Sequence, residues 1–454
     1  MHGTGSLRRR ASGPAAGSRS VKAGTAVLLL GLVSGCAALP PGAAGPGDPP
    51  DLSLLQQAMK QVETSYVAPV TSNQLVTGAL KGMLDRLDPH SDYMDEREYR
   101  ELMTVTSGEF AGVGIELSVE EGVPQVISAI DGTPASRAGI EPGDRIVKAD
   151  GQPTVGMDLE DIVKRLRGPA GTRVVLTVAR SNRPPFEVPI TRAVIHVDSV
   201  KYDLEPNGIG YVRISTFGET TATELRNAVA DLRRRAGGRF SGFILDLRND
   251  AGGLLDAAVD VADDFLDSGT VVTTRGRESE ENQVYVAPAK GDLIRGTPVV
   301  VLINGASASA AEIVAGALQD NRRGVVMGTR SFGKGSVQSI IPLEGGHGAL
   351  RLTTALYYTP SGRSIQGRGI TPEIVLNLPK DEQVANAIIT YESDLFGSLK
   401  NGGVLDTGAA AKPEPPPSPS ADHPINPKIL GTPQDTQLRA AIDYLQSHRT
   451  AAVR

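Results

Sequence analysis

Three short polar loops, each directly after an apolar run typical of a buried β-strand, constrain the fold of this chain more than any other feature. The runs and the loops that follow them are 243–247 with 248–253, 299–303 with 307–312, and 325–327 with 331–335. In an open α/β sheet, ligands bind outside the carboxyl ends of the strands. We therefore expect an α/β core in which the three loops meet at one crevice.

The loops contain the groups that a serine nucleophile needs for acyl transfer. Ser309 offers a hydroxyl and Lys334 an amine, whereas histidine, the usual base, is absent from all three loops. A lysine acts as a base only when its pKa lies well below about 10.4, and burial without a carboxylate partner lowers it. The apolar neighbours Phe332 and Val337 favour such burial. Gln338 lies four residues after Lys334 in an alternating run, so we expect both on one face of a strand, where the amide orients the amine.

A helix is expected over residues 310–319, directly after Ser309. Helix N-termini present unpaired N–H groups, so we expect the Ala310 N–H to face an oxyanion that forms at Ser309. Gly253 is the natural second donor, because glycine lets the backbone approach a substrate carbonyl. Glu312 lies three residues after Ser309, on the same face of this helix.

Each of these signals also has an ordinary structural interpretation. A serine before a helix usually caps it, Gly-Lys-Gly is usually a turn with a solvated lysine, and Gly-Gly is usually a tight connection. Residues 328–334 match a phosphate-binding P-loop, but Gly335 stands where that motif requires Ser or Thr, and a strand-like run follows instead of a helix. Nucleotide binding is therefore disfavoured. Catalysis is the better interpretation because the three signals coincide at strand ends.

These stretches resemble the carboxyl-terminal processing (tail-specific) proteases, serine peptidases with a Ser–Lys mechanism and a PDZ domain. The resemblance covers about 52–378 and is carried by 78–84, 87–91, 245–253, 307–312, 328–338 and 358–370. It implies an α/β and α+β multidomain fold, with a crotonase/ClpP-like protease core, an inserted PDZ domain and helical N- and C-terminal segments. It implies no cofactor and no metal ion. The pair Asp250-Ala251 departs from the Asn-Pro or Asn-Gly of many members, beside the expected oxyanion hole.

The resemblance also implies a role for individual residues. Ser309 would be the nucleophile and Lys334 the general base, with Gln338 as the partner that orients the lysine. Gly253 and Ala310 would be the two oxyanion donors. Glu312 and Asp320 would be the two supporting residues.

Residues 108–182 have the order of strands, turns and helices of a PDZ-type domain. An amphipathic helix over 159–166 has apolar residues at positions i, i+3, i+4 and i+7. Such domains bind a chain end as an added strand, and loop amides hold its terminal carboxylate. A generic hairpin with a helix is the alternative. Arg167 resembles an arginine through which some relatives couple peptide binding to the active site. The expected carboxylate-binding residues are Gly112, Val113, Gly114 and Ile115.

Residues 1–36 have the pattern of an export signal, with basic residues before an apolar run at 26–33 that is too short to span a bilayer. The stretch 32–36 resembles a bacterial lipobox. We therefore expect Cys36 to be lipidated and to attach the protein to a membrane of the cell envelope, in the periplasm. It is the only cysteine, so no intrachain disulfide can form. Ordinary cleavage near Ala38, or an uncleaved anchor, is the alternative.

The rest of the chain divides by composition. We expect a Pro/Gly tether at 37–50, an N-terminal helical region at 51–100 and the protease core at 186–380. A helical extension at 381–405, a Pro-rich linker at 406–430 and a C-terminal helix at 431–454 follow. The last helix suits either packing on the core or dimerisation. The net charge is −6 without a basic stripe, so nucleic acid is not an expected partner.

The leading hypothesis is a serine endopeptidase that cuts exported proteins near their C-termini. Its expected partners are protein substrates with free C-termini, and an adaptor or a second copy of the chain stays open. A catalytically inactive, lipid-anchored PDZ scaffold is the alternative. The intact set of Ser309, Lys334 and Gln338 argues against it.

Overall fold

The computed structural model describes residues 52–451 apart from six gaps. These gaps are 121, 131, 181–182, 289–290, 385–388 and 401–423. The expected export signal, Cys36 and the tether lie outside the described residues, as does the expected Pro-rich linker up to residue 423.

The chain has two units, residues 1–69 and 70–454, which are described separately. The first unit contains α1 within its described part; the second begins with α2, whose N-terminus is a capping box between Thr71 and Gln74. Strand β1 interrupts the helical region expected over 51–100, because it pairs with a strand of the core instead. These N-terminal elements are α1 (Ser53–Ser65), α2 (Ser72–Leu84), β1 (Asp92–Met94) and α3 (Glu96–Ser107).

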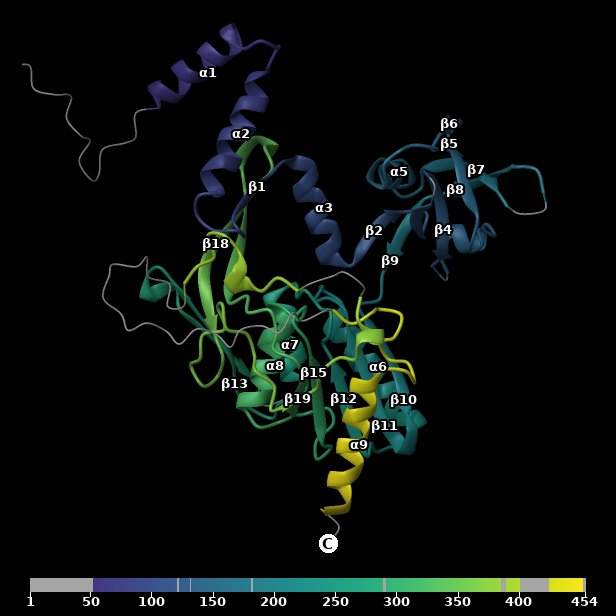
Figure 1. Cartoon of the computed structure of the whole chain (residues 1–454), viewed down its shortest axis with the longest axis vertical. Helices are drawn as coiled ribbons and strands as arrows, with labels where there is room; N and C mark the ends of the chain where they lie inside the picture. Colours follow the sequence, from purple (N-terminus) through teal and green to yellow (C-terminus); the bar gives the residue numbers. More distant parts are fainter. Residues whose placement is uncertain are drawn as a thin grey trace, which may run out of the picture. The chain divides into compact units, whose positions relative to one another are not determined.

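The segment expected to be a PDZ domain folds as a sheet with two helices (Figure 1). The strand order is β3-β4-β5-β7-β8, and β6 pairs with β5. Ile162 and Leu166 of α5 are buried with the inward side chains of β7, as the amphipathic pattern predicts. Among the described strands β3 pairs with β4 alone, so its other edge is free. The elements are β3 (Ile115–Glu120), β4 (Val123–Ala129), α4 (Pro134–Arg137), β5 (Arg145–Ala149), β6 (Gln152–Pro153), α5 (Leu159–Leu166), β7 (Arg173–Ala179) and β8 (Phe186–Thr191).

A six-stranded sheet forms the centre of the core, in the order β10-β11-β12-β15-β16-β19. Strand β10 is antiparallel to β11, and the other neighbours are parallel. The two-stranded pair β2-β9 connects the PDZ segment to this core. The strands are β2 (Glu109–Gly112), β9 (Ala193–His196), β10 (Val200–Glu205), β11 (Ile209–Ile214), β12 (Gly242–Asp246), β15 (Val299–Ile303), β16 (Val325–Gly328) and β19 (Ile374–Val375).

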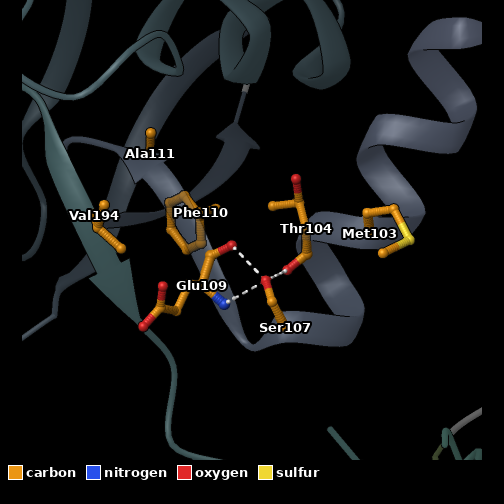
Figure 2. Close-up of a pocket in the computed structure, with 7 residues that line it drawn as sticks. All are labelled: Met103, Thr104, Ser107, Glu109, Phe110, Ala111 and Val194. Atoms are coloured by element: carbon orange, nitrogen blue, oxygen red, sulfur yellow. Dashed lines mark hydrogen bonds between the residues drawn. The ribbon is translucent and has the colours of Figure 1, made fainter. Parts of the chain in front are cut away.

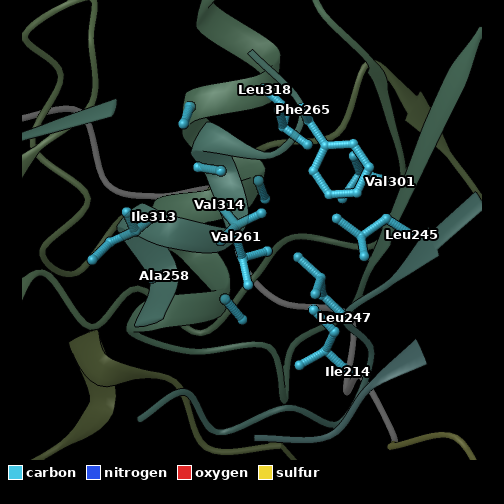
Figure 3. Close-up of a cluster of buried hydrophobic side chains, with 14 of the residues drawn as sticks. Ile214, Leu245, Leu247, Ala258, Val261, Phe265, Val301, Ile313, Val314 and Leu318 are labelled. Carbon is cyan, nitrogen blue, oxygen red and sulfur yellow. The ribbon is translucent and has the colours of Figure 1, made fainter. Parts of the chain in front are cut away.

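Both faces of this sheet are buried, which explains why its strands are continuous apolar runs rather than alternating ones. Leu245 and Val301 share a buried cluster with residues of α6, α7 and α8. Figure 3 shows this cluster around Phe265, with labelled residues of α7 and α8. Ile244 and Leu302, one position away along their strands, face α9. The four helices are α6 (Thr221–Arg235), α7 (Leu255–Asp263), α8 (Ala310–Asp320) and α9 (Thr436–Ala451).

A second, antiparallel sheet has the order β1-β18-β13-β14, and β17 also pairs with β18. Val271 and Val272 of β13 join the cluster beneath α7 and α8, so this sheet shares a core with the parallel one. Its strands after β1 are β13 (Gly269–Gly276), β14 (Gln283–Ala287), β17 (Ser336–Pro342) and β18 (Ala349–Tyr358). Short 3-10 turns lie at η1 (Pro206–Gly208), η2 (Ser279–Glu281), η3 (Glu344–Gly346), η4 (Lys380–Glu382) and η5 (Glu392–Asp394).

The C-terminal part differs from its sequence-based description. The described residues of 381–405 contain 3-10 turns and no α-helix, because Tyr391 and Glu392 are buried in the core and hold this stretch against it. Residues 424–430 were expected to belong to the Pro-rich linker, but their start packs against the protein. Ile425 is fully buried and forms a β-bridge with Gln383. Helix α9 packs on the parallel sheet, the first of the two roles considered for it.

None of the helices in the described ranges combines the length and the apolar character needed to cross a bilayer.

Candidate active site

The loops after β12, β15 and β16 meet at one edge of the sheet, as their common placement predicted. The Ala308 N–H donates to the Asp250 carbonyl oxygen (2.9 Å), which joins the first loop to the second. The Phe332 N–H donates to the Ser307 carbonyl oxygen (2.9 Å), which joins the second to the third. The buried Ser307 hydroxyl donates to the Leu247 carbonyl oxygen (2.7 Å). Parallel neighbours end at the same edge, and these bonds hold the three loops together there.

Ser309 stands at the N-terminus of α8 in an unusual backbone conformation. Its φ is +56° and its ψ is −113°, a region that residues with a Cβ rarely adopt. Its side chain is half-buried. Such strain persists only where the surroundings over-determine it, and it is concentrated at functional sites.

Glu312 is one of the residues that hold Ser309 in this conformation. Its fully buried carboxylate lies in the first turn of α8. One oxygen, Oε2, accepts hydrogen bonds from the backbone N–H of Ser309 (2.8 Å) and of Lys334 (2.9 Å). The other, Oε1, accepts from the Ser331 hydroxyl (2.5 Å) and the Gly333 N–H (2.7 Å). Burial raises the pKa of Glu312 to about 7, while these hydrogen bonds act in the opposite direction. A single carboxylate thus holds the serine and lysine loops in register.

Tyr357 is a second link between the two loops, and no sequence pattern predicts it. Its hydroxyl lies 3.1 Å from the Ser309 carbonyl oxygen and also contacts the Lys334 carbonyl oxygen. The residue is fully buried near the end of β18. A tyrosine in an alternating strand is normally a core residue, so only the assembled structure reveals this contact.

Lys334 has the surroundings that a neutral amine requires. Burial lowers the pKa of Lys334, and the Arg351 guanidinium lowers it further, whereas Glu392, Glu312 and Asp88 oppose the effect. The direction is the one expected from its apolar neighbours. Among the described residues, Lys334 Nζ makes no hydrogen bond with the Ser309 hydroxyl; catalytic hydrogen bonds often tighten only when substrate is bound.

The expected shared face of Lys334 and Gln338 is absent. Lys334 precedes β17 and so lies outside the strand on whose alternation that expectation depends; the register shift beside Val337 and Gln338 places its extra residue, Thr354, on the neighbouring strand β18. The Gln338 amide instead donates to the Ser336 hydroxyl (3.0 Å) and the Thr353 hydroxyl (3.1 Å). Gln338 as the orienting partner of Lys334 stays a prediction.

The two expected oxyanion donors are available. Neither the Ala310 N–H nor the Gly253 N–H donates a hydrogen bond within the described part of the chain. Gly253 forms a parallel bridge with Phe217 through its neighbours, so its own N–H points away from Phe217. A Cβ on Gly252 (φ +95°) would lie 2.8 Å from the Ser309 Cβ, and one on Gly253 (φ +151°) only 2.1 Å from the Phe217 carbonyl oxygen. Only glycines bring this loop so close to Ser309.

Asp320 lies at the other end of α8, about 16 Å along an eleven-residue helix. It accepts hydrogen bonds from Arg363 (2.7 Å) and from the Ser361 N–H (3.0 Å). It therefore fixes the turn after β18 and does not contact the serine or the lysine.

The expected carboxylate loop of the PDZ segment has free donors. The carbonyl oxygens of Val113 and Gly114 accept hydrogen bonds from Ala135 (2.9 Å) and Ile130 (3.0 Å). The N–H groups of Val113 and Gly114 donate to no other described residue. Of the two outer members, Gly112 ends β2 and Ile115 opens the free-edged strand β3.

Arg167 follows α5, and its guanidinium carbon lies 5.3 Å from the ring centre of Phe110. Phe110 and Val194, from the paired strands β2 and β9, line one side of a pocket of about 320 Å³ (Figure 2). Met103 and Thr104 of α3 line the other side. The pocket contains none of the expected catalytic residues, and the assignment of Arg167 as a gate stays a prediction.

One group of described residues has the composition of a metal site, His196, Asp198 and Glu224. Both Glu224 oxygens are already engaged, Oε2 by the N–H and hydroxyl of Ser199 and Oε1 by the Thr220 hydroxyl and the His196 ring. We therefore assign Glu224 a structural role at the start of β10.

The α/β core, the PDZ-like segment and the N-terminal region each match a known protein family. Residues 208–376 match the family model "Peptidase family S41", residues 125–180 match "PDZ domain", and residues 43–98 match "Activating protease CtpB N-terminal domain". The chain is similar to the carboxy-terminal-processing protease of Bartonella bacilliformis, with 47% identity over 83% of this chain and 86% of that one. It is also similar to the carboxy-terminal processing protease CtpA of Bacillus subtilis, with 34% identity over 76% and 73%.

The chain belongs to the carboxy-terminal-processing proteases of peptidase family S41, and it is a serine protease. The family resemblance and the multidomain fold with a PDZ domain are thereby confirmed. A solved structure, the photosystem II D1 C-terminal processing protease, matches with 30% identity over 71% of this chain and 92% of that one. The TM-score of this match is 0.43.

Proposed function

We propose that this C-terminal processing protease cleaves exported proteins near their C-termini by a Ser–Lys mechanism. Ser309 is the nucleophile and Lys334 its general base. The observation that carries the proposal is the shared oxygen of Glu312, which accepts the backbone N–H of both residues and so brings nucleophile and base to one point.

The reaction follows from the positions of these groups. Neutral Lys334 takes the proton from the Ser309 hydroxyl as the oxygen attacks the scissile carbonyl, and the N–H groups of Gly253 and Ala310 stabilise the oxyanion. Protonated Lys334 then gives its proton to the leaving amine, which leaves an acyl-enzyme on Ser309. Lys334 next removes a proton from the water that hydrolyses this ester. No metal or cofactor takes part in these steps.

Substrate selection belongs to the PDZ domain in this proposal. The free N–H groups of Val113 and Gly114 bind the terminal carboxylate, and the last residues of the substrate pair with the free edge of β3. Export and lipidation at Cys36 complete the proposal and place the enzyme at a membrane of the cell envelope. The inactive-scaffold alternative is not favoured, since the relatives are named as proteases.

The test is the rate of cleavage of an unfolded polypeptide. Ser309→Ala and Lys334→Ala should each reduce kcat/KM by at least about 10³-fold, the usual loss when a member of a catalytic unit is removed. Lys334→Arg should be equally inactive, because a guanidinium does not lose its proton.

Lys201→Ala is the matched control, since this lysine is exposed on β10. It should cleave at the wild-type rate, and all variants should keep the wild-type circular dichroism spectrum. A folded Lys334→Ala enzyme with wild-type activity would show that Lys334 is not the base.

A further inference from the structure

Two buried carboxylates near Lys334 have no part in the mechanism described so far. Asp88 is 6% exposed in the turn before β1, and Glu392 is fully buried in η5. Burying a carboxylate is unfavourable unless its oxygens are satisfied, and the partners of both residues lead toward the lysine loop.

Asp88 is connected to Gln338. Its Oδ1 accepts hydrogen bonds from the N–H of His90 (2.8 Å) and of Ser91 (2.9 Å), which closes the turn. The same oxygen accepts from the Thr353 hydroxyl (3.1 Å), and the Thr353 oxygen accepts from the Gln338 amide (3.1 Å). Ser91 adds a second link, because its hydroxyl accepts from the Thr353 N–H (3.1 Å). The side chain of Gln338 is thus fixed from the N-terminal region.

Glu392 is connected to the residue that follows Lys334. Its Oε1 accepts from the side-chain NH₂ of Gln366 (2.7 Å), and the side-chain oxygen Oε1 of Gln366 accepts from the Gly335 N–H (2.9 Å). The other oxygen of Glu392 lies 2.8 Å from the His90 ring nitrogen. The Glu392 N–H also donates to the Phe332 carbonyl oxygen (3.2 Å). The lysine loop is therefore held on both sides of Lys334.

We propose that Asp88 and Glu392 are positioning residues for the general base, Asp88 through Thr353, Gln338 and the hydroxyl of Ser336, two residues after Lys334, and Glu392 through Gln366 and Gly335. His90 joins the two systems, because its backbone binds Asp88 and its ring binds Glu392. The inference depends on the proposed role of Lys334 as the base.

The effect of the surrounding charges on the pKa of Lys334 distinguishes this proposal from a purely structural role of Asp88 and Glu392. The charged groups that act on Lys334 are Arg351 of β18, Glu312 of α8, Glu392 of η5 and Asp88. The three carboxylates raise the pKa of Lys334, and Arg351 lowers it together with burial. Removing a carboxylate should therefore lower the pKa of the amine, and removing Arg351 should raise it.

The experiment measures the titration of Lys334 directly. Cyanate carbamylates neutral amines, so its rate of reaction with Lys334 as a function of pH, followed by peptide mass spectrometry in Ser309→Ala protein, gives the midpoint without any need for activity. Asp88→Asn and Glu392→Gln should shift the midpoint to lower pH, and Arg351→Gln should shift it to higher pH. Glu98→Gln is the matched control, because the Glu98 carboxylate accepts hydrogen bonds from the Lys81 amine and the Asp95 backbone N–H. This substitution should leave the midpoint unchanged.

The same substitutions in the active enzyme should reduce kcat/KM by about 10- to 100-fold at its pH plateau, the usual consequence of a misplaced catalytic group. Their acid limbs should move in the directions of the carbamylation midpoints. If Asp88→Asn fails to fold, Glu392→Gln carries the test.

Two results separate this inference from the proposed function. Midpoints that move as predicted while Lys334→Ala cleaves normally would retain the positioning roles and remove the base assignment. An unchanged midpoint in Asp88→Asn and Glu392→Gln, with the expected shift in Arg351→Gln, would overturn the inference.

Discussion

The backbone conformation of Ser309, which presents its hydroxyl, costs on the order of 1–3 kcal/mol for a residue with a Cβ. Contacts on both sides keep it there, with Glu312 on its N–H and Tyr357 at its carbonyl oxygen. Both partners also contact the backbone of Lys334. Strain at the serine and alignment with the lysine therefore have the same structural cause.

The environment of Lys334 predicts an acid limb in the pH profile. Burial lowers the pKa of this amine, so the neutral, basic form persists to lower pH than for an ordinary lysine. Below its pKa the amine is protonated and cannot accept the serine proton. We expect kcat/KM on an uncharged reporter peptide to fall as the pH decreases through that pKa. A profile without an acid limb would contradict the neutral-lysine mechanism.

Asp250, beside the expected oxyanion hole, gives a second pH-dependent prediction. The residue is fully buried; its Oδ1 accepts from the Gly252 N–H (2.8 Å), and its Oδ2 has no partner among the described residues. Burial raises the pKa of Asp250 well above its usual range, against the opposing effects of the Gly252 N–H and Arg213. The folded state therefore binds this proton more strongly than the unfolded chain does, and the stability that it contributes is lost as the pH rises above about 4.

Asp250→Asn removes that loss, because an amide has the same shape and no charge. We expect the variant to gain stability relative to wild type as the pH rises, measured by urea unfolding at pH 5 and pH 8. Asp161→Asn, at an exposed position of α5, should not change with pH relative to wild type. Equal pH dependences for Asp250→Asn and wild type would show that Asp250 is charged in the native protein.

At the scale of elements, α9 completes the core. Leu438, Ala441 and Leu445 cover the face of the parallel sheet opposite α6, α7 and α8. Just before the helix, Asp435 forms a bidentate pair with Arg248, and both side chains are fully buried. Arg248 lies in the loop that leads to Gly253, so the C-terminal segment supports the expected oxyanion loop.

Two substitutions in this segment should destabilise the protein. Asp435→Ala leaves the Arg248 charge buried with less compensation and should cost about 3–5 kcal/mol. Leu445→Ala opens a cavity against Gly242 and should cost about 2–5 kcal/mol. Asp443→Ala, on the exposed side of α9, should stay within about 0.5 kcal/mol of wild type. Urea unfolding measures all three, and a wild-type midpoint for both core variants would refute this role of α9.

The elements that the sequence predicted are those whose signal is local. Strands β12, β15 and β16 are apolar runs that end in turn residues, and α8 begins at a serine followed by helix formers. The elements that it missed depend on tertiary contacts. The stretch around Glu392 forms a 3-10 turn rather than an α-helix, with the Glu392 side chain buried in the core. Ile425, expected in the Pro-rich linker, packs beside Gln383.

The candidate site shows the same division. The placement of Ser309, Lys334, Gly253 and Ala310 could be predicted, because each residue stands at a strand end or a helix start. The four-fold engagement of Glu312 and the contacts of Tyr357 could not, since their partners lie far apart in sequence. The alternating run likewise does not show that its strand begins only at Ser336, after Lys334.

At the scale of the whole molecule, the proposed function requires that the PDZ domain and the active site act on the same substrate chain. In the proposed function, the terminal carboxylate binds the N–H groups of the loop from Gly112 to Ile115, and Ser309 cuts upstream of that end. An amidated C-terminus removes the charge, and each charge-assisted hydrogen bond that is lost is worth about 1.5–3 kcal/mol. That corresponds to roughly 10- to 150-fold for each bond.

Gly114→Ala disrupts this loop, because a Cβ there would lie 2.3 Å from the Thr133 Cβ. Gly122→Ala is its matched control: Gly122 also has a positive φ, in the turn between β3 and β4, but a Cβ there would meet no atom within 4 Å. Both substitutions introduce similar backbone strain, and only the first alters the expected carboxylate site.

The most direct test of the account is the ratio of kcat/KM for one peptide with a free acid and with an amidated C-terminus, with Ser309→Ala as the blank. We predict that wild type and Gly122→Ala cleave the acid at least about tenfold faster than the amide, and that Gly114→Ala loses this preference. Equal cleavage of acid and amide by the wild-type enzyme would contradict recognition of the substrate C-terminus.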